Sequence, residues 1–163
     1  MKVVIFIGSE SDYEVVQDAV QIFKEFEIPF GLEVTSAHRS PERTENLIRK
    51  FEKQGVEIFI AVAGKAAHLA GVVASRTVLP VIGVPVRGSS LSGLDALLST
   101  SQMPKGVPVA CMGIGKSGAS NAALLSIQIL ALKDQTLKEK MKAYRIQMAS
   151  KVEEASKKIQ ENL

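Results

Sequence analysis

Short apolar runs alternate with helical patterns along this 163-residue chain, and that alternation limits the fold more than any other feature. The first run, Val-Val-Ile-Phe-Ile at residues 3–7, is continuous, as in a strand buried on both faces of a sheet. Apolar residues then recur every three or four positions over residues 12–27, which predicts an amphipathic helix. Strand and helix alternate in this way five times, so the sequence predicts a parallel sheet covered by helices.

The expected elements can be placed by residue number. Strands are expected at residues 3–7, 30–35, 56–63, 80–86 and 107–114. Helices are expected at residues 12–27, 41–54, 66–76, 94–99, 121–132 and 135–160. Ser11 and Glu14 have the spacing of a capping box for the first helix. The prediction is a three-layer α/β/α domain with a five-stranded parallel sheet, a flavodoxin-like strand order and a long C-terminal helix.

The length suits a single catalytic domain, residues 1–163, with a core at 1–132 and a helical extension at 133–163. The extension carries eight Lys and Arg against five Asp and Glu, so the net charge of +3 belongs to it. The two signs are mixed, as on a solvated helix face. With no Trp and no basic stripe, the sequence gives little support for nucleic-acid binding.

The composition also bears on the compartment. The sequence contains no run of about 18 apolar residues, so no membrane span is predicted. The apolar start at residues 3–7 is short for a signal peptide and is interpreted as a strand. The single Cys111 excludes an intrachain disulfide and suits a reducing cytoplasm. Its apolar neighbours predict a buried, inert thiol.

The last helix carries an apolar stripe that has two interpretations. The stripe consists of Leu137, Met141, Tyr144, Met148, Val152, Ala155 and Ile159. The helix either packs back on its own domain or crosses to a neighbouring subunit. We favour the second interpretation, because a helix of about 25 residues reaches nearly 40 Å, at about 1.5 Å per residue.

Polar residues follow each of the first three expected strands, at 8–12, 36–40 and 64–68. The carboxyl ends of parallel strands are where open α/β sheets bind ligands. The first segment, Gly-Ser-Glu-Ser-Asp, places backbone N–H groups at a helix start, which suits an anion, although it has neither a Walker nor a dinucleotide fingerprint. Asp12 is better suited to ribose hydroxyls than to a phosphate. The structural alternative is that these residues only cap the helix.

The other two segments supply the two histidines of the chain. His38 can move protons near neutral pH, and Arg39 has the planar fork that suits a phosphate. His68 lies among small residues that let a ligand approach the backbone. Taken singly, His38 and Arg39 could be an ordinary surface loop, His68 a core histidine, and Lys65 a solvent-facing charge. No His, Cys, Asp and Glu set has zinc-type spacing, so a metal is not indicated.

Ordered motifs carry a resemblance to a known family. They read Gly-Ser-x-Ser-Asp at 8–12, Ser-Ala-His-Arg-x-Pro at 36–41 and Ala-Gly-x-Ala-Ala-His-Leu-x-Gly at 63–71, followed by matching stretches at 79–86, 93–99, 102–110 and 121–125. Over residues 3 to 132 the chain resembles the N5-carboxyaminoimidazole ribonucleotide mutases of purine biosynthesis. It departs from the family at Lys65, Ala70 and Ile7, where glycine, proline and methionine are usual.

The resemblance implies transfer of a carboxylate from the exocyclic nitrogen of an imidazole ribonucleotide to ring carbon C4. It also implies a flavodoxin-like core, a homo-octamer with sites at subunit junctions, and no metal or organic cofactor. Two alternatives stay open: a direct carboxylase of 5-aminoimidazole ribonucleotide that uses CO2, and a paralogue that binds the nucleotide without turnover.

The resemblance also assigns roles residue by residue. His38 is implied as the acid/base, and Ser9, Asp12 and Arg39 as nucleotide-binding residues. The remaining implied substrate-binding residues are Ser11, Ser36, Ala37, Gly64, Lys65, Ala66, His68 and Leu69. Among these, His68 with Gly64, Ala66 and Leu69 would line the base end. Lys65, a long cation where the family usually has glycine, would either narrow the pocket or change the surroundings of the substrate's carboxylate.

Overall fold

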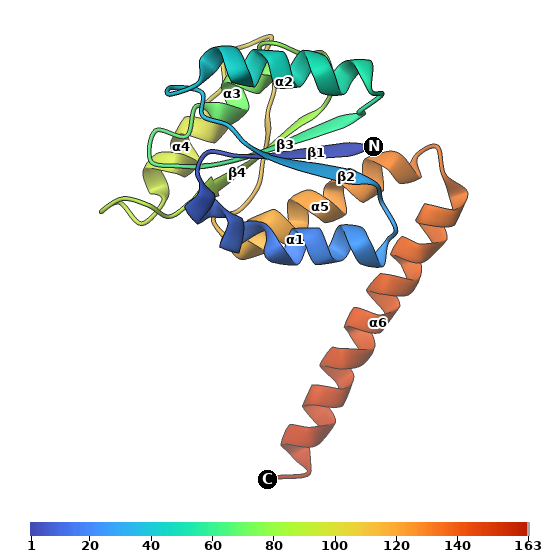
Figure 1. Cartoon of the computed structure of the whole chain (residues 1–163). Helices are drawn as coiled ribbons and strands as arrows, with labels where there is room; N and C mark the ends of the chain where they lie inside the picture. The colour runs from blue at the N-terminus through green and yellow to red at the C-terminus, as the bar shows by residue number, and fades with distance from the viewer. Residues whose placement is uncertain (163) are drawn as a thin grey trace. The chain divides into compact units, whose positions relative to one another are not determined.

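The structure is a computed structural model that describes residues 1–162, and it has the predicted architecture of a five-stranded parallel sheet between helices (Figure 1). The strands are β1 (Val3–Ile7), β2 (Phe30–Val34), β3 (Ile58–Gly64), β4 (Val81–Val86) and β5 (Ala110–Cys111). The helices are the short 3-10 turn η1 (Glu10–Asp12), α1 (Tyr13–Glu25), α2 (Pro41–Lys53), α3 (Leu69–Ala74), α4 (Leu94–Ser101), α5 (Lys116–Ala131) and α6 (Gln135–Gln160). The strand order is β2-β1-β3-β4-β5, which confirms the flavodoxin-like prediction.

The chain forms two compact units, which are described separately. The first consists of Met1–Ser126 and contains the whole sheet. The second begins at Ile127 and contains the last turn of α5 together with α6. Among residues 1–162, no helix has both the length and the apolar character needed to cross a membrane.

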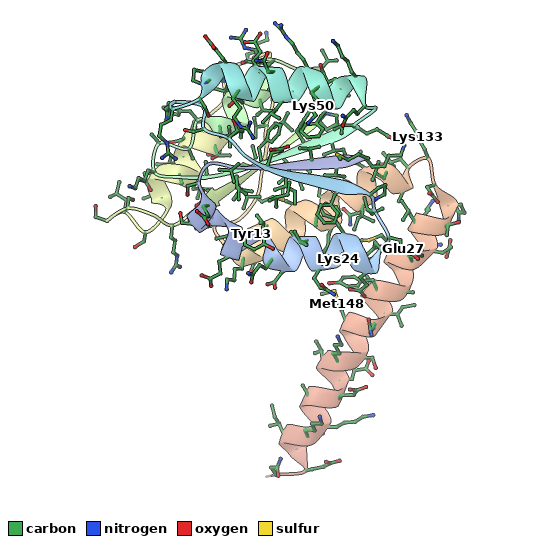
Figure 2. The ribbon with its side chains drawn as sticks, in the orientation of Figure 1. Tyr13, Lys24, Glu27, Lys50, Lys133 and Met148 are labelled. Carbon is green, nitrogen blue, oxygen red and sulfur yellow. The ribbon has the colours of Figure 1, made fainter. Side chains whose placement is uncertain are left out.

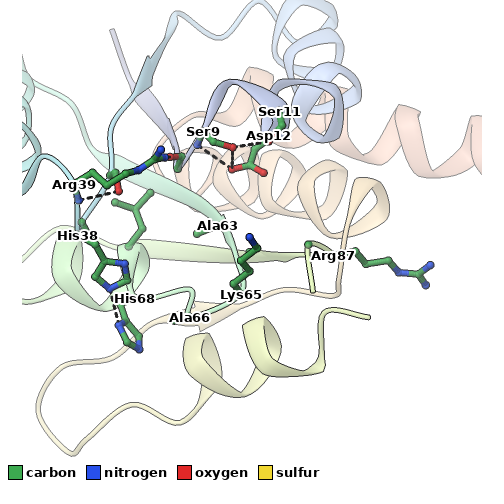
Figure 3. A pocket seen from close by; sticks show the side chains of 16 residues that line it. Ser9, Ser11, Asp12, His38, Arg39, Ala63, Lys65, Ala66, His68 and Arg87 are labelled. Atoms are coloured by element: carbon green, nitrogen blue, oxygen red, sulfur yellow. Dashed lines mark hydrogen bonds between the residues drawn. The ribbon is translucent and has the colours of Figure 1, made fainter. Parts of the chain in front are cut away.

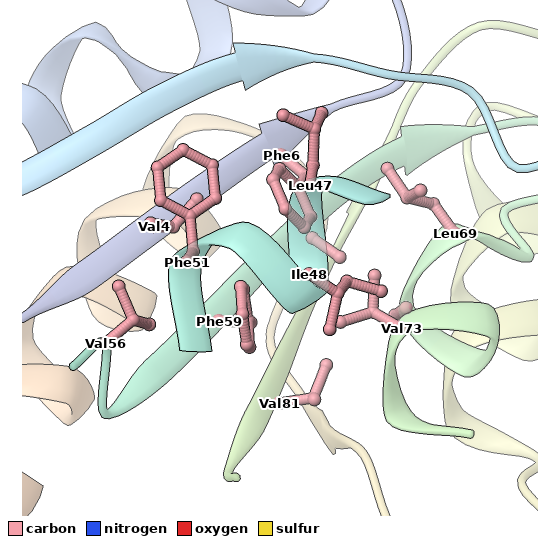
Figure 4. Packing of buried hydrophobic residues seen from close by; sticks show 12 residues of the cluster. Val4, Phe6, Leu47, Ile48, Phe51, Val56, Phe59, Leu69, Val73 and Val81 are labelled. Carbon is pink, nitrogen blue, oxygen red and sulfur yellow. The ribbon is translucent and has the colours of Figure 1, made fainter. Parts of the chain in front are cut away.

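The core of the first unit is built on β1, which lies between β2 and β3 and is fully buried. Helices α2, α3 and α4 cover one face of the sheet, and α1 with the first part of α5 covers the other (Figure 1). On the α2 face, Phe6 packs on Phe51 and Phe59, with ring centroids 6.2 and 5.4 Å apart (Figure 4). Burying one such side chain contributes about 1.5–3 kcal/mol. The continuous apolar run of β1 therefore reflects burial on both faces.

Helix α2 shows how the sequence divides polar from apolar faces. Its buried residues, Leu47, Ile48 and Phe51, recur at helical spacing and face the sheet. The lysine between them, Lys50, is exposed, and its ammonium lies 5.1 Å from the centroid of the Phe51 ring (Figure 2). Pro41 occupies the start of the helix, as in the expected range 41–54, and Gly55 follows its end with a φ of +79°.

Several predicted boundaries are wrong. The expected strand at 107–114 shortens to Ala110–Cys111, because β5 is an edge strand and only these two residues pair with β4. The expected helix at 66–76 begins only at Leu69, because residues 65–68 form tight turns in which Ala67 N–H donates to the Lys65 carbonyl.

Helix α5 begins earlier than expected, at Lys116 rather than at residue 121. Gly118 makes this start close-packed, since a Cβ built on it would lie 1.7 Å from the Gly113 carbonyl oxygen. Helix α1 ends at Glu25 rather than residue 27, and Glu27 has a φ of +56°. By contrast, the expected bounds of the last helix, 135–160, match α6.

Candidate active site

The carboxyl ends of β1, β2, β3 and β4 meet at one edge of the sheet, around a cavity of about 610 Å³ (Figure 3). All twelve residues predicted from the sequence as site residues line it, and the structure leaves none of them out. They are Ser9, Ser11, Asp12, Ser36, Ala37, His38, Arg39, Gly64, Lys65, Ala66, His68 and Leu69.

The segment after β1 is organised by Asp12. Its Oδ2 accepts hydrogen bonds from the Ser9 backbone N–H at 3.0 Å and from the Ser9 hydroxyl at 3.2 Å. The Ser9 and Ser11 hydroxyl oxygens lie 2.6 Å apart. The capping pair is therefore Ser9 with Asp12, and the predicted pair of Ser11 with Glu14 is wrong, because the short turn η1 precedes α1.

Burial raises the pKa of the Asp12 carboxyl above its ordinary value of 3.8. The hydrogen bonds from Ser9 and the charge of Arg39 oppose that rise but do not cancel it. Two donors and a guanidinium thus hold a half-buried carboxylate at the cavity wall. Such a group can accept hydrogen bonds from ligand hydroxyls.

The loop after β2 closes on itself through two serines. Ser40 N–H donates to the Ser36 carbonyl at 2.9 Å, and Ser36 N–H donates to the Ser40 hydroxyl at 3.1 Å. The hydroxyl of Ser36 accepts from Arg39 N–H at 3.2 Å. Below the loop, the buried hydroxyls of Thr35 and Thr44 lie 2.8 Å apart. The loop is therefore fixed to α2 at its base and presents His38 at its tip.

The two histidines meet in the cavity. His38 Nε2 lies 2.9 Å from His68 Nδ1, and the rings meet edge to face with centroids 5.0 Å apart (Figure 3). One of these nitrogens donates and the other accepts, so the tautomers of the two rings are coupled. This contact uses Nε2 of His38 and does not involve its other ring nitrogen, Nδ1. Neither histidine is buried, so the interpretation of His68 as a core histidine is wrong.

Arg39 joins the first two segments. Its Nη2 donates to the Gly8 carbonyl at 3.1 Å, across the edge of the sheet from its own loop. This bond uses one of the five N–H donors of the guanidinium. Because the structure places Arg39 beside Ser9 and Asp12, cation, carboxylate and hydroxyls occupy the same side of the cavity (Figure 3).

The segment after β3 supplies the opposite wall. Lys65 has a φ of +56°, a conformation that L residues rarely adopt. His68 N–H then donates to the Ala66 carbonyl at 2.8 Å, and His68 directly precedes α3 rather than lying within a helix as expected. The small side chains of this segment keep the cavity open beside the imidazole pair.

Four lining residues, Gly8, Ala63, Arg87 and Gly88, were not among the predicted site residues, although Gly8 begins the predicted 8–12 segment. Arg87 and Gly88 follow β4. The signal that finds them is the one used for the other segments, a polar residue and a glycine directly after a buried strand. The Arg87 guanidinium points away from the imidazole pair (Figure 3).

Cys111 lies on β5 and does not line this cavity. It is half-buried rather than fully buried as expected. Burial raises the pKa of its thiol, which agrees with the predicted inert character.

Comparison with known proteins gives a consistent result. The family described as AIR carboxylase matches residues 2–151. An N5-carboxyaminoimidazole ribonucleotide mutase of Pyrococcus horikoshii is 49% identical over 157 residues, which cover 96% of this chain and 88% of the relative. The protein of the same name from Saccharolobus solfataricus is 50% identical over 151 residues, 93% of this chain and 94% of the relative. The crystal structure of Treponema denticola PurE superposes with a TM-score of 0.86 at 28% identity and covers 96% of this chain and 96% of that one.

Proposed function

The chain belongs to the AIR carboxylase family, and from that membership we propose that it catalyses the N5-carboxyaminoimidazole ribonucleotide mutase reaction of purine biosynthesis. In this isomerisation the carboxylate leaves the exocyclic nitrogen of the substrate and is attached to ring carbon C4. The observation that carries the proposal is the level of identity, about half of all residues over nearly the whole chain, to relatives named for this reaction.

The reaction needs an acid that gives one proton to the exocyclic nitrogen and a base that then removes one proton from C4. When the N–C bond breaks, the nitrogen takes up a proton and CO2 is released. C4 then attacks CO2, and the proton on C4 must leave. An imidazole suits both proton steps, because it gains and loses a proton near neutral pH. We propose His38 as this acid/base, acting through Nδ1, since its Nε2 faces His68.

The phosphate of the substrate suits Arg39, because a guanidinium is a cation with several N–H donors. The guanidinium keeps donors for a phosphate beyond the one that contacts Gly8, and the hydroxyls of Ser9 and Ser11 lie on the same wall. Asp12 suits the ribose hydroxyls, because a carboxylate accepts hydrogen bonds and repels a phosphate. With the phosphate and ribose held there, the base extends toward the imidazole pair.

Small residues at the base end support the capture of CO2. Gly64, Ala66 and Ala37 line the cavity beside the histidines, and Leu69 adds an apolar side chain. CO2 is small and uncharged, so enclosure against C4 raises its effective concentration without a specific binding group. Ser36 contributes to this enclosure indirectly, because its hydrogen bonds hold the His38 loop closed.

We also propose that the protein works in the cytoplasm as a homo-octamer, with the whole chain as one catalytic domain. The exposed apolar side chains of α6 support an assembly, since Ile146, Val152 and Ile159 are 71%, 71% and 65% exposed. Light scattering tests the octamer. A protein that stays a monomer at micromolar concentration would refute it.

One assay separates the candidate reactions. The protein is given N5-carboxyaminoimidazole ribonucleotide in one reaction, and 5-aminoimidazole ribonucleotide with bicarbonate in another. A mutase forms product from the first at low concentration, a direct carboxylase forms it from the second, and a binding-only paralogue forms none but is thermally stabilised by the nucleotide. His38→Asn should abolish conversion and keep nucleotide binding. Near-normal turnover in that variant would exclude the proton role of His38.

A further inference from the structure

One lysine in the cavity has features that the proposed mutase reaction does not yet use. Lys65 directly follows β3 and shares its tight turn with the segment that leads to His68. Figure 3 shows its amino group directed into the space between the imidazole pair and the Ser9–Asp12 wall, whereas the Arg87 guanidinium points away. Lys65 is thus a cation aimed into the site from the wall that carries His68.

The backbone at this lysine is unfavourable. Its φ of +56° lies in the left-handed region, which costs an L residue stability and costs glycine nothing. Residues held in such conformations cluster at functional sites. A glycine at this position would allow the turn at no cost, so what the lysine adds is its side chain.

The ammonium of Lys65 has no protein counterion. Among residues 1–162 it takes part in no ion pair and no hydrogen bond. The one carboxylate that lines the cavity, Asp12, already accepts two hydrogen bonds from Ser9. A cation that faces a cavity without a partner is suited to an anionic group of a ligand.

We infer that Lys65 determines the specificity of the site by binding the carboxylate of the substrate, an inference that rests on the proposed mutase function. The substrate carries two anionic groups, a phosphate and a carboxylate. Arg39 lies on the Gly8 wall and suits the phosphate. Lys65 lies on the His68 wall, where the carboxylate must be if His38 acts at C4, and a compact ammonium suits one carboxylate.

This assignment predicts which kinetic constant the lysine controls. The carboxylate is present in substrate and product, whereas the CO2 between them is uncharged. Lys65 contacts the carboxylate until the N–C bond breaks, so it lowers the free energies of the bound substrate and of the bond-breaking transition state alike. Losing it should therefore raise KM and leave kcat nearly unchanged. It should also leave unchanged the affinity for 5-aminoimidazole ribonucleotide, which has the same phosphate, ribose and ring but no carboxylate.

The test uses the full chain and three variants. Lys65→Met keeps the length and the strained backbone but removes the charge, Lys65→Arg keeps a cation, and Lys65→Gly removes both charge and strain. The measurements are KM and kcat for N5-carboxyaminoimidazole ribonucleotide, and the inhibition constant of 5-aminoimidazole ribonucleotide. We expect KM to rise roughly tenfold in Lys65→Met and Lys65→Gly, with kcat and the inhibition constant within about twofold of the native values. Lys65→Arg should recover most of the loss.

The other outcomes overturn the inference in distinguishable ways. Equal increases in KM and in the inhibition constant would mean that Lys65 binds a part common to both nucleotides. An unchanged KM, or a fall in kcat alone, would remove it from ground-state binding of the carboxylate. Normal KM in Lys65→Gly but not in Lys65→Met would assign the effect to the methionine side chain rather than to the lost charge. A native chain that does not convert the N-carboxylated nucleotide overturns the proposed function, and this inference with it.

Discussion

The buried hydroxyl pair of Thr35 and Thr44 gives a prediction whose size follows from counting protons. Both side chains are buried, with 2% and 0% of their surface exposed, and their oxygens lie 2.8 Å apart. Thr44 also donates to the Ser40 carbonyl at 3.2 Å. Each hydroxyl can donate only one hydrogen bond. Because Thr44 donates its own to the Ser40 carbonyl, Thr35 must be the donor in the bond between the two threonines.

The two valine substitutions therefore differ in cost. Thr44→Val leaves the Thr35 hydroxyl buried with no acceptor, which lowers the free energy of unfolding by about 1–3 kcal/mol. Thr35→Val leaves the Thr44 donation to Ser40 intact, so it costs about 0.5–1.5 kcal/mol, the net value of one hydrogen bond. In a chain that already has valine at 35, Thr44→Val should cost less than in the native chain. The Ser40 carbonyl still accepts from the Thr44 backbone N–H in every variant.

Urea unfolding of the native protein, both single variants and the double variant measures this cycle. All four are compared at one protomer concentration, because assembly makes stability concentration-dependent. Two results would refute the proton count: additive costs within about 0.5 kcal/mol, or a larger cost for Thr35→Val than for Thr44→Val.

Three further predictions concern single positions. Gly118→Ala should lower the free energy of unfolding by about 1–3 kcal/mol because its Cβ would strike the Gly113 carbonyl. The control Gly113→Ala, with nothing within 4 Å, should change it by less than about 0.5 kcal/mol, so equal urea midpoints would contradict the packing. Asp12 has a raised pKa, so the folded state binds its proton more tightly and loses stability as the pH rises from 3.8 through that raised value. Asp12→Asn should gain stability relative to the native protein over that range, and parallel melting curves would exclude the effect. Cys111 should react with a thiol reagent more slowly in the folded protein than in urea, because burial raises its pKa, and equal rates would argue against burial.

The sequence predicted the sheet well because its strongest signal is burial. The runs at β1, β3 and β4 are apolar without interruption, and their approximate places and the strand order were correct. The β5 prediction was wrong in length because an apolar run does not reveal how many residues find a partner at a sheet edge. The predicted start of α3 was wrong because the turn before it depends on a positive φ at Lys65, and a lysine in the sequence does not indicate a positive φ.

The cavity was predictable to the extent that its residues follow strands. Polar residues after three strands indicated one wall each, and the same reasoning applied to Arg87 would have added the fourth. What no spacing could give is the direct contact of His38 with His68. These residues lie 30 positions apart, and their meeting depends on the conformations of two loops that close through local hydrogen bonds.

The distribution of the cavity over four strand ends has a consequence for folding kinetics. Its lining residues extend from Gly8 to Gly88, so no early fragment of the chain contains the whole cavity. Pairing of distant parallel strands is slow, and the walls can meet only after β1, β3 and β4 have joined. The nucleotide therefore has no complete cavity to bind until these strands have paired. It should therefore slow unfolding while leaving the refolding rate nearly unchanged.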